Sequence, residues 1–227
     1  MADQLILNTR DNREARLPHE PDGGPDGQRP LVAVVTPVYR DWPSFARLLD
    51  GLDRVAAAEG VELTIVAVND CPGPAAAPDV AGPWTAIRQI EIIHLTRNLG
   101  HQRAIAVGLS HVEVSVRCAC VVVMDADGED QPDDVIGLLR AFRTAPNAIV
   151  VAQRRKRSEG SLFRHSYKMY KAAFRLFTGQ NVDFGNFCLI PRPLLIHLVS
   201  MSEIWSNFPA GIIQSRLPIV RDRKSVV

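Results

Sequence analysis

Short apolar runs alternate with amphipathic helical patterns along most of this chain, and this alternation constrains the fold more than any other feature. The first run, LVAVVTPV from Leu31, has the length and β-branched content of a buried strand, and apolar residues recur with helical spacing from Trp42 to Glu59. Such a pattern predicts an α/β fold with a mostly parallel sheet covered on both faces. We expect further strands at 62–69, 90–95, 118–124 and 148–153, and helices at 100–111, 132–145 and 161–178.

Length and composition indicate one soluble domain. The chain has 227 residues, 46% of them hydrophobic, which is enough for a single substantial core. Residues 1–29 are polar and rich in proline and glycine, so we predict a disordered tail there. The four cysteines include no C-x-x-C pair and are expected to be reduced core thiols. Because no apolar stretch reaches about 18 residues, the chain is expected in the cytoplasm.

The run VVVMDADGEDQPDDV at 121–135 leads from an apolar strand directly into a dense group of carboxylates. Ligands bind at the carboxyl ends of strands in such sheets, and Gly128 permits the backbone to turn there. Asp125 and Asp127 would repel each other without a cation, and hard oxygen ligands suit Mg²⁺ or Mn²⁺ together with substrate phosphates. We therefore predict a metal–phosphate site. The remaining carboxylates are interpreted as the start of the following helix: Glu129, Asp130, Asp133 and Asp134.

Four motifs in register carry a family resemblance: VVTPVYRD, AVNDCPG, HLTRNLGHQRAIAVGL and VVVMDADGEDQPDDV. Together they resemble glycosyltransferase family 2, and within it the polyprenyl-phosphate glycosyltransferases of the dolichyl-phosphate mannose synthase and bactoprenol glucosyltransferase type. The resemblance implies a GT-A fold with a Rossmann-like sheet. It also implies a catalytic domain at 30–217, with a nucleotide-binding half at 30–130 and an acceptor half at 131–217. Residues 218–227 are then interpreted as a truncated or non-native end.

The implied reaction moves a sugar, with inversion, from a UDP- or GDP-sugar to a polyprenyl phosphate. Asp127 and Asp125 match the family's D-x-D motif, which implies that they hold Mg²⁺ or Mn²⁺ and act in catalysis. Asn69 stands where the family usually has aspartate, and Asp70 and the loop at Asn98 and Gly100 have an alternative interpretation as turn residues. The implied nucleotide-sugar contacts are Pro37, Tyr39, Asn69, Asp70, Arg97, Asn98, Gly100, Asp125 and Ala126.

The acceptor half adds a basic, aromatic segment and one further departure from the family. Asn186 and Cys188 occupy positions where many members have aspartate and arginine, and the loss of the aspartate favours a phosphate acceptor over a sugar hydroxyl. The segment could equally be a helix with one solvated face, or could contact an anionic membrane surface on the cytoplasmic side. The implied acceptor and phosphate contacts are Arg154, Arg164, Lys168 and Asn186.

Several other functions remain open at this stage. A nucleotidyltransferase would usually carry a phosphate loop rich in glycine and lysine after the first strand, and TPVYRDWPSF is not such a loop. A non-catalytic nucleotide-sugar-binding module, or a transferase acting on a sugar hydroxyl in cell-envelope polysaccharide synthesis, is the alternative reading. Nucleic acid is not an expected partner, because the net charge is only +1 and no recognised binding motif is present.

Overall fold

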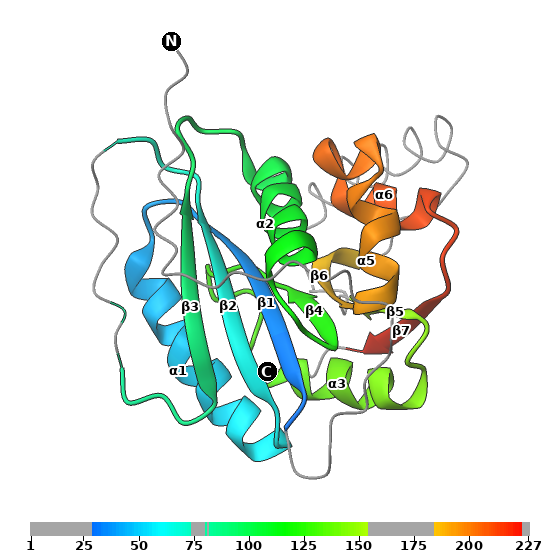
Figure 1. Ribbon diagram of the computed structural model, residues 1–227, viewed down its shortest axis with the longest axis horizontal. Coiled ribbons are helices and arrows are strands. Elements are labelled where there is room, and N and C mark those ends of the chain that lie inside the picture. Colours follow the sequence, from blue (N-terminus) through cyan, green and yellow to red (C-terminus); the bar gives the residue numbers. More distant parts are fainter. Residues whose placement is uncertain (1–28, 74–79, 81, 154–183, 224–227) are drawn as a thin grey trace, which may run out of the picture.

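The computed structural model describes residues 29–73, 80, 82–153 and 184–223. Within them, strands form one seven-stranded sheet in the order β3-β2-β1-β4-β6-β5-β7 (Figure 1). The first four strands in this order are mutually parallel, β6 is antiparallel to both of its neighbours, and β7 is parallel to β5. The predicted mostly parallel sheet is therefore confirmed. The strands are β1 (Leu31–Val38), β2 (Glu62–Asn69), β3 (Ile87–His94), β4 (Cys120–Val123), β5 (Ile149–Gln153), β6 (Phe184–Pro191) and β7 (Ile219–Arg223).

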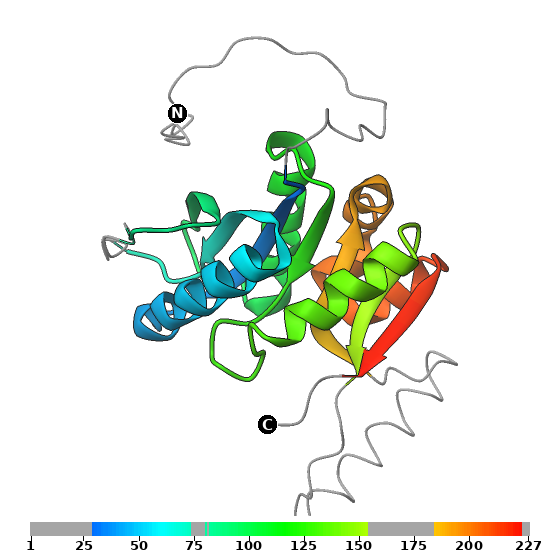
Figure 2. The same cartoon turned by 90° about the horizontal axis from the view of Figure 1, so that it is seen from below.

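Helices cover both faces of the sheet, as the apolar strands predict (Figures 1 and 2). Successive residues of β1 alternate between the two cores, with Val34 in one and Val35 in the other. The first core packs under α1 (Trp42–Glu59) and α3 (Asp134–Thr144). The second packs under α2 (His101–Ser115), α5 (Arg192–Val199), η1 (Ser202–Trp205) and α6 (Phe208–Gln214).

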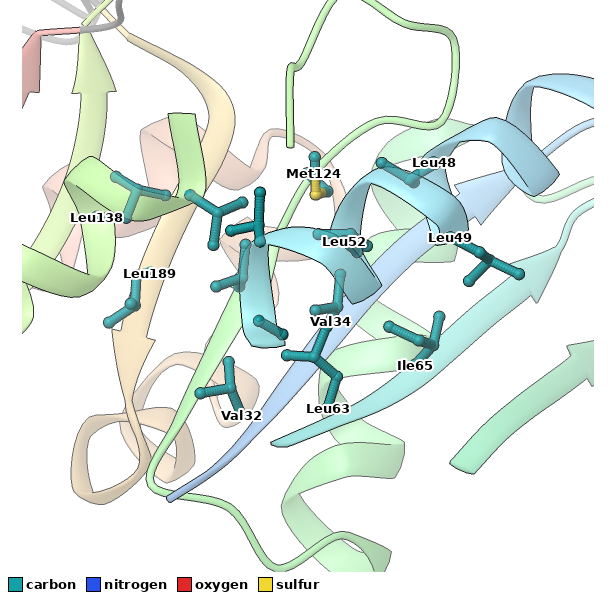
Figure 3. Packing of buried hydrophobic residues seen from close by; sticks show 14 of the residues in the cluster. Val32, Val34, Leu48, Leu49, Leu52, Leu63, Ile65, Met124, Leu138 and Leu189 are labelled. Atoms are coloured by element: carbon teal, nitrogen blue, oxygen red, sulfur yellow. The ribbon is translucent and has the colours of Figure 1, made fainter. Parts of the chain in front are cut away.

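The first core shows why the α1 sequence forms a helix on this sheet. Its buried residues recur three and four positions apart, so they form one apolar stripe. Leu48, Leu49 and Leu52 project from this stripe onto Val34 and Ile65 of the neighbouring strands (Figure 3). Asp41 begins the helix by accepting the Ser44 N–H at 3.1 Å, and Gly60 ends it with a φ of 67°. The predicted bounds of α1 are confirmed.

Other element boundaries differ from the sequence-based expectation by a few residues. β3 begins at Ile87 rather than 90, because the Asp53 carboxylate accepts the backbone N–H groups of Thr85, Ala86 and Ile87 and fixes the chain before the strand. β4 is shorter than 118–124, and α2 continues past 111 to Ser115.

Burial raises the pKa of Cys118 to about 11, and all four cysteines are unpaired, as expected.

The largest differences from expectation lie after residue 183. No strand was expected over Phe184–Pro191, yet β6 lies inside the sheet, paired with both β4 and β5. β7 pairs with β5 through Arg223, so the sheet extends beyond residue 217, where the sequence analysis ended the domain. The predicted helix at 161–178 and all but the last residue of the predicted tail at 1–29 lie outside the described residues. Across the described part of the chain, no helix combines the length and hydropathy needed to span a bilayer.

Helix α2 approaches the sheet closely at a glycine, and this generates a stability prediction. A Cβ atom at Gly108 would lie 2.5 Å from Val35 Cγ1 and 3.0 Å from Val68 Cγ2. Glycine to alanine normally stabilises a helix interior by about 1 kcal/mol. Here we expect Gly108→Ala to lower the free energy of unfolding by about 1–3 kcal/mol, because the strands must move to admit the methyl group.

Urea unfolding checks this, with Val114→Ala as the control on the same helix, since Val114 is 83% exposed. The control should change the unfolding free energy by less than about 0.5 kcal/mol. A more stable Gly108→Ala protein would contradict close packing at this point.

Candidate active site

A pocket of about 310 Å³ opens at the carboxyl ends of β1, β2 and β4, where parallel strands bring their following loops together. The loops after β1 and β4 and the loop that precedes α2 form its walls. Four carboxylates and one imidazole face it. The lining residues are Pro37, Val38, Tyr39, Asp41, Asp70, Asn98, Gly100, His101, Asp125, Ala126 and Asp127.

Asp70, at the end of β2, fixes the loop that precedes α2. Its Oδ1 accepts the Leu99 N–H at 2.6 Å and its Oδ2 accepts the Gly100 N–H at 2.9 Å. Asp70 is buried, and Gly100 has a φ of 86°, a conformation that favours glycine. The carboxylate therefore holds Asn98 and Gly100 at the pocket wall and sets where α2 begins.

A second buried carboxylate fixes the loop after β4. Asp130 Oδ2 accepts the Asp125 N–H at 2.9 Å, and Asp130 is only 4% exposed. Gly128 has a φ of 86°, so the backbone turns after Asp127 as its sequence predicts. Asp127 Oδ1 accepts the Glu129 N–H at 2.9 Å, which closes the turn. The loop thus holds Asp125 and Asp127 at the pocket while it satisfies its own backbone.

His101, the first residue of α2, lies beside Asp125. Its Nε2 is 3.2 Å from Asp125 Oδ1 and 2.8 Å from Asn186 Nδ2. The interaction with the Asp125 carboxylate raises the pKa of His101, and burial of the ring opposes this. Asp125 Oδ1 is itself buried, and no donor among the described residues completes a hydrogen bond to it. A buried carboxylate oxygen in this state is suited to binding a cation or a ligand donor.

The structure brings together most of the predicted site residues. Pro37, Tyr39, Asp70, Asn98, Gly100, Asp125, Ala126 and Asp127 all line the pocket. Asn186 lies behind His101 and contacts it, whereas Asn69 and Arg97 are not part of the lining. The Asn69 side chain is 1% exposed; its oxygen accepts the Cys71 N–H and its nitrogen lies 3.1 Å from His94 Nδ1. Arg154, Arg164 and Lys168 lie outside the described residues.

Sequence reasoning missed three residues at the site. His101 is not among the site residues expected from the sequence, although it directly follows Gly100 and lines the pocket. Asp130 was interpreted as a helix-start residue, yet it holds the backbone of Asp125, ahead of α3. Asp41 lines the pocket and caps α1. Only the approach of separate loops in space identifies these roles.

The carboxylates of the pocket could supply some, but not all, of the ligands of a divalent cation. Within the described ranges, no group of three histidine, cysteine, aspartate or glutamate side chains is placed to hold a metal ion by itself. Asp125 and Asp127 nevertheless offer oxygens at one pocket, one of them buried without a hydrogen-bond donor. Mg²⁺ commonly takes one or two carboxylates and completes its shell with substrate phosphates and water. The residues present suit that arrangement.

Comparison with known proteins finds consistent similarities. The family model described as Glycosyl transferase family 2 matches residues 33–198. The chain is 22% identical over 174 residues to an uncharacterized glycosyltransferase of Synechocystis, covering 76% of this chain and 54% of that protein. It is 29% identical over 161 residues to the undecaprenyl-phosphate 4-deoxy-4-formamido-L-arabinose transferase of Klebsiella pneumoniae, covering 68% of this chain and 46% of that protein. The chain thus spans about half the length of these curated relatives.

The fold is also similar to that of solved structures. The mannosyl-3-phosphoglycerate synthase from Rubrobacter xylanophilus has a TM-score of 0.59 and 18% identity, covering 87% of this chain and 67% of that one. The S. aureus TarS structure has a TM-score of 0.53 and 12% identity, covering 85% of this chain and 58% of that one. These similarities and the sheet order confirm the expected GT-A fold.

The bidentate role of Asp70 generates a testable prediction. Asp70→Asn replaces one carboxylate oxygen with an amide group, which must then face the N–H of either Leu99 or Gly100. We expect the free energy of unfolding to fall by about 1–3 kcal/mol, because one buried N–H loses its acceptor. Denaturant unfolding measures this loss. Asp50→Asn, an exposed change on α1, is the matched control, and equal stabilities for the two variants would refute the role of Asp70.

Proposed function

Because the chain belongs to Glycosyl transferase family 2, we propose that it transfers a sugar from a nucleotide-diphosphate sugar to a polyprenyl phosphate, with inversion at the anomeric carbon. The donor carries UDP or GDP, and Mg²⁺ or Mn²⁺ assists the reaction. The observation that carries this proposal is that Asp125 and Asp127 line one pocket at the strand ends, where Asp125 Oδ1 is buried without a hydrogen-bond donor in the described part of the chain.

The negative charge of the pocket supports a nucleotide-sugar donor that binds together with a cation. Asp41, Asp70, Asp125 and Asp127 all line it, so a diphosphate would be repelled in the absence of a counter-charge. Asp70 uses both of its oxygens for backbone N–H groups, whereas Asp127 uses only Oδ1, so Asp127 and Asp125 on the same loop are the carboxylates that we assign to the cation. When bound, the cation supplies Lewis-acid stabilisation of the diphosphate leaving group. The N-terminus of α2, at the same wall, adds a favourable dipole for phosphate.

The proposed transfer is a single displacement at the anomeric carbon. The bond between that carbon and the donor diphosphate oxygen breaks, and the nucleoside diphosphate leaves with the electron pair. A phosphate oxygen of the acceptor forms the new bond from the opposite face. An ionised phosphate needs no general base, which agrees with a site whose imidazole is already engaged with Asn186.

The choice of acceptor rests on two supports. The Klebsiella pneumoniae relative is named for transfer to undecaprenyl phosphate, and 68% of this chain aligns with it. The second support is Asn186, because an amide cannot accept the proton of a sugar hydroxyl as a carboxylate base would. A polyprenyl phosphate would reach this protein from the cytoplasmic face of a membrane, and the proposal accordingly places the protein there.

Ligand-induced stabilisation tests the donor site without requiring turnover. We expect either UDP or GDP, together with Mn²⁺, to raise the melting temperature by several degrees, since ligand at about 100 times its Kd adds about 2.7 kcal/mol. Asp127→Asn should abolish the metal-dependent part of the shift. The change keeps an oxygen for the Glu129 N–H, so the turn itself should survive.

Asp50→Asn is the charge-matched control for this titration and should respond like the wild type. Transfer of labelled sugar to undecaprenyl phosphate then tests the acceptor. A folded protein that neither nucleotide stabilises would refute the donor site. Transfer to a sugar hydroxyl instead of the lipid phosphate would refute only the acceptor.

A further inference from the structure

An arginine beside the pocket has a backbone conformation that arginine rarely adopts. Arg40 lies in the loop after β1, between Tyr39 and Asp41, and has a φ of 62°. This left-handed conformation is unfavourable for a residue with a Cβ atom, so it persists only where the surrounding contacts maintain it. Among the described residues, the other non-glycine residue with a positive φ is Arg216, at 55°.

The Arg40 side chain connects the loop after β1 to the loop after β2. Its Nε donates to Cys71 Sγ at 3.4 Å, and its guanidinium carbon lies 5.2 Å from the centre of the Tyr39 ring. A guanidinium over an aromatic face is attracted by the ring electrons. Because Nε is used at the sulfur, the planar guanidinium is held at two points and has a defined orientation on the ring.

Cys71 is a fixed anchor for the guanidinium. It is 7% exposed, and its backbone N–H donates to Asn69 Oδ1 at 3.2 Å. Asn69 is the last residue of β2 and is itself buried. The thiol is therefore held at the end of a buried strand, and this strand end determines where the Arg40 guanidinium lies.

The ring that Arg40 contacts belongs to the pocket wall. Tyr39 lines the pocket and is 51% exposed, whereas Arg40 is not one of the lining residues. An exposed ring without a neighbour on its face can change rotamer, and fixing it when a ligand binds costs entropy. The guanidinium reduces this cost. Flat bases stack on aromatic faces, so the ring suits the nucleoside part of a nucleotide.

We propose that Arg40 is a positioning residue: anchored on Cys71, it holds the Tyr39 ring at the pocket wall, where the ring stacks on the nucleoside part of the donor. The inference rests on the proposed function above, which supplies a nucleotide as the ligand. An arginine with a merely structural role would leave the affinity for the nucleotide unchanged. An arginine that served as a counter-charge would affect nucleotide and inorganic pyrophosphate alike.

Arg40→Asn tests the proposal without straining the loop, because asparagine adopts a left-handed backbone more readily than arginine does. We measure binding by calorimetry with UDP, GDP and inorganic pyrophosphate, each with Mg²⁺. The Kd of the nucleotide that binds the wild type should rise by about five- to tenfold, because the ring loses its guanidinium neighbour. The Kd of pyrophosphate should change by less than about twofold, because exposed charges are screened by salt.

Arg216→Asn is the matched control. It makes the same substitution at the same kind of backbone conformation, at an exposed residue between α6 and β7. It should leave the Kd of every ligand unchanged. Melting curves of both variants show that they are folded.

Cys71→Ala separates the anchor from the charge, because it keeps the Arg40 guanidinium and removes the sulfur that fixes it. The nucleotide Kd should rise in this variant too, by about threefold, while the pyrophosphate Kd stays within about twofold of the wild type. A change confined to the nucleotide in both variants supports positioning of the ring.

A measurement without ligand tests the contact itself. The chain has three tyrosines, so spectra of protein labelled only in its tyrosine rings are simple, and Tyr39→Phe assigns the Tyr39 signal. Nuclear Overhauser effects between this ring and the Arg40 side chain should be present in the wild type. They should weaken in Cys71→Ala, because the guanidinium has lost its anchor.

Three results would overturn the proposal. One is a wild-type protein without the Overhauser effects between Arg40 and Tyr39. Another is an unchanged nucleotide Kd in folded Arg40→Asn. The third is an equal loss of affinity for pyrophosphate, which would make Arg40 a phosphate contact. A wild type that shows the contact between Arg40 and Tyr39 but binds neither nucleotide refutes the proposed function itself, and with it the ligand assigned to the ring.

Discussion

Val32 to Val38 of β1 are buried without exception, because helices cover both faces of the strand and β2 and β4 cover both of its edges. Burying seven consecutive residues leaves no place for a charge within the strand, so polar groups begin where it ends. The same condition holds for the neighbouring parallel strands, whose carboxyl ends lie at one edge. The pocket and its four carboxylates follow from this shared edge.

The carboxylates at this edge divide into two structural roles. Asp70 and Asp130 are buried and accept backbone N–H groups, and Asp41 does the same at the start of α1. These contacts make the loops rigid without adding a hydrophobic core of their own. Asp125 and Asp127 are held in place by that framework and keep oxygens directed to the pocket. A site built in this way is positioned before any ligand arrives, which reduces the entropy that binding must overcome.

β6 joins β4 to β5 within the sheet. It is antiparallel to β4 and β5 and brings Asn186 next to His101, although 85 residues separate them in the chain. A residue of β6 thereby contacts a residue of the pocket wall, although Asn186 itself does not line the pocket.

The sequence by itself determined strands β1 to β5, helices α1 to α3 and the carboxylates at the end of β4, because hydrophobic periodicity and glycine and aspartate at strand ends are local signals. The lining by Asp125 and Asp127 was predictable in this way, whereas the lining by Pro37, Asp70 and Gly100 was implied by the family resemblance. The tertiary structure alone decided the position of β6, the burial of Asn69 and the contacts of His101 and Asp130. Each of these depends on hydrogen bonds to residues brought together by folding, and the spacing of residues along a chain does not specify such partners.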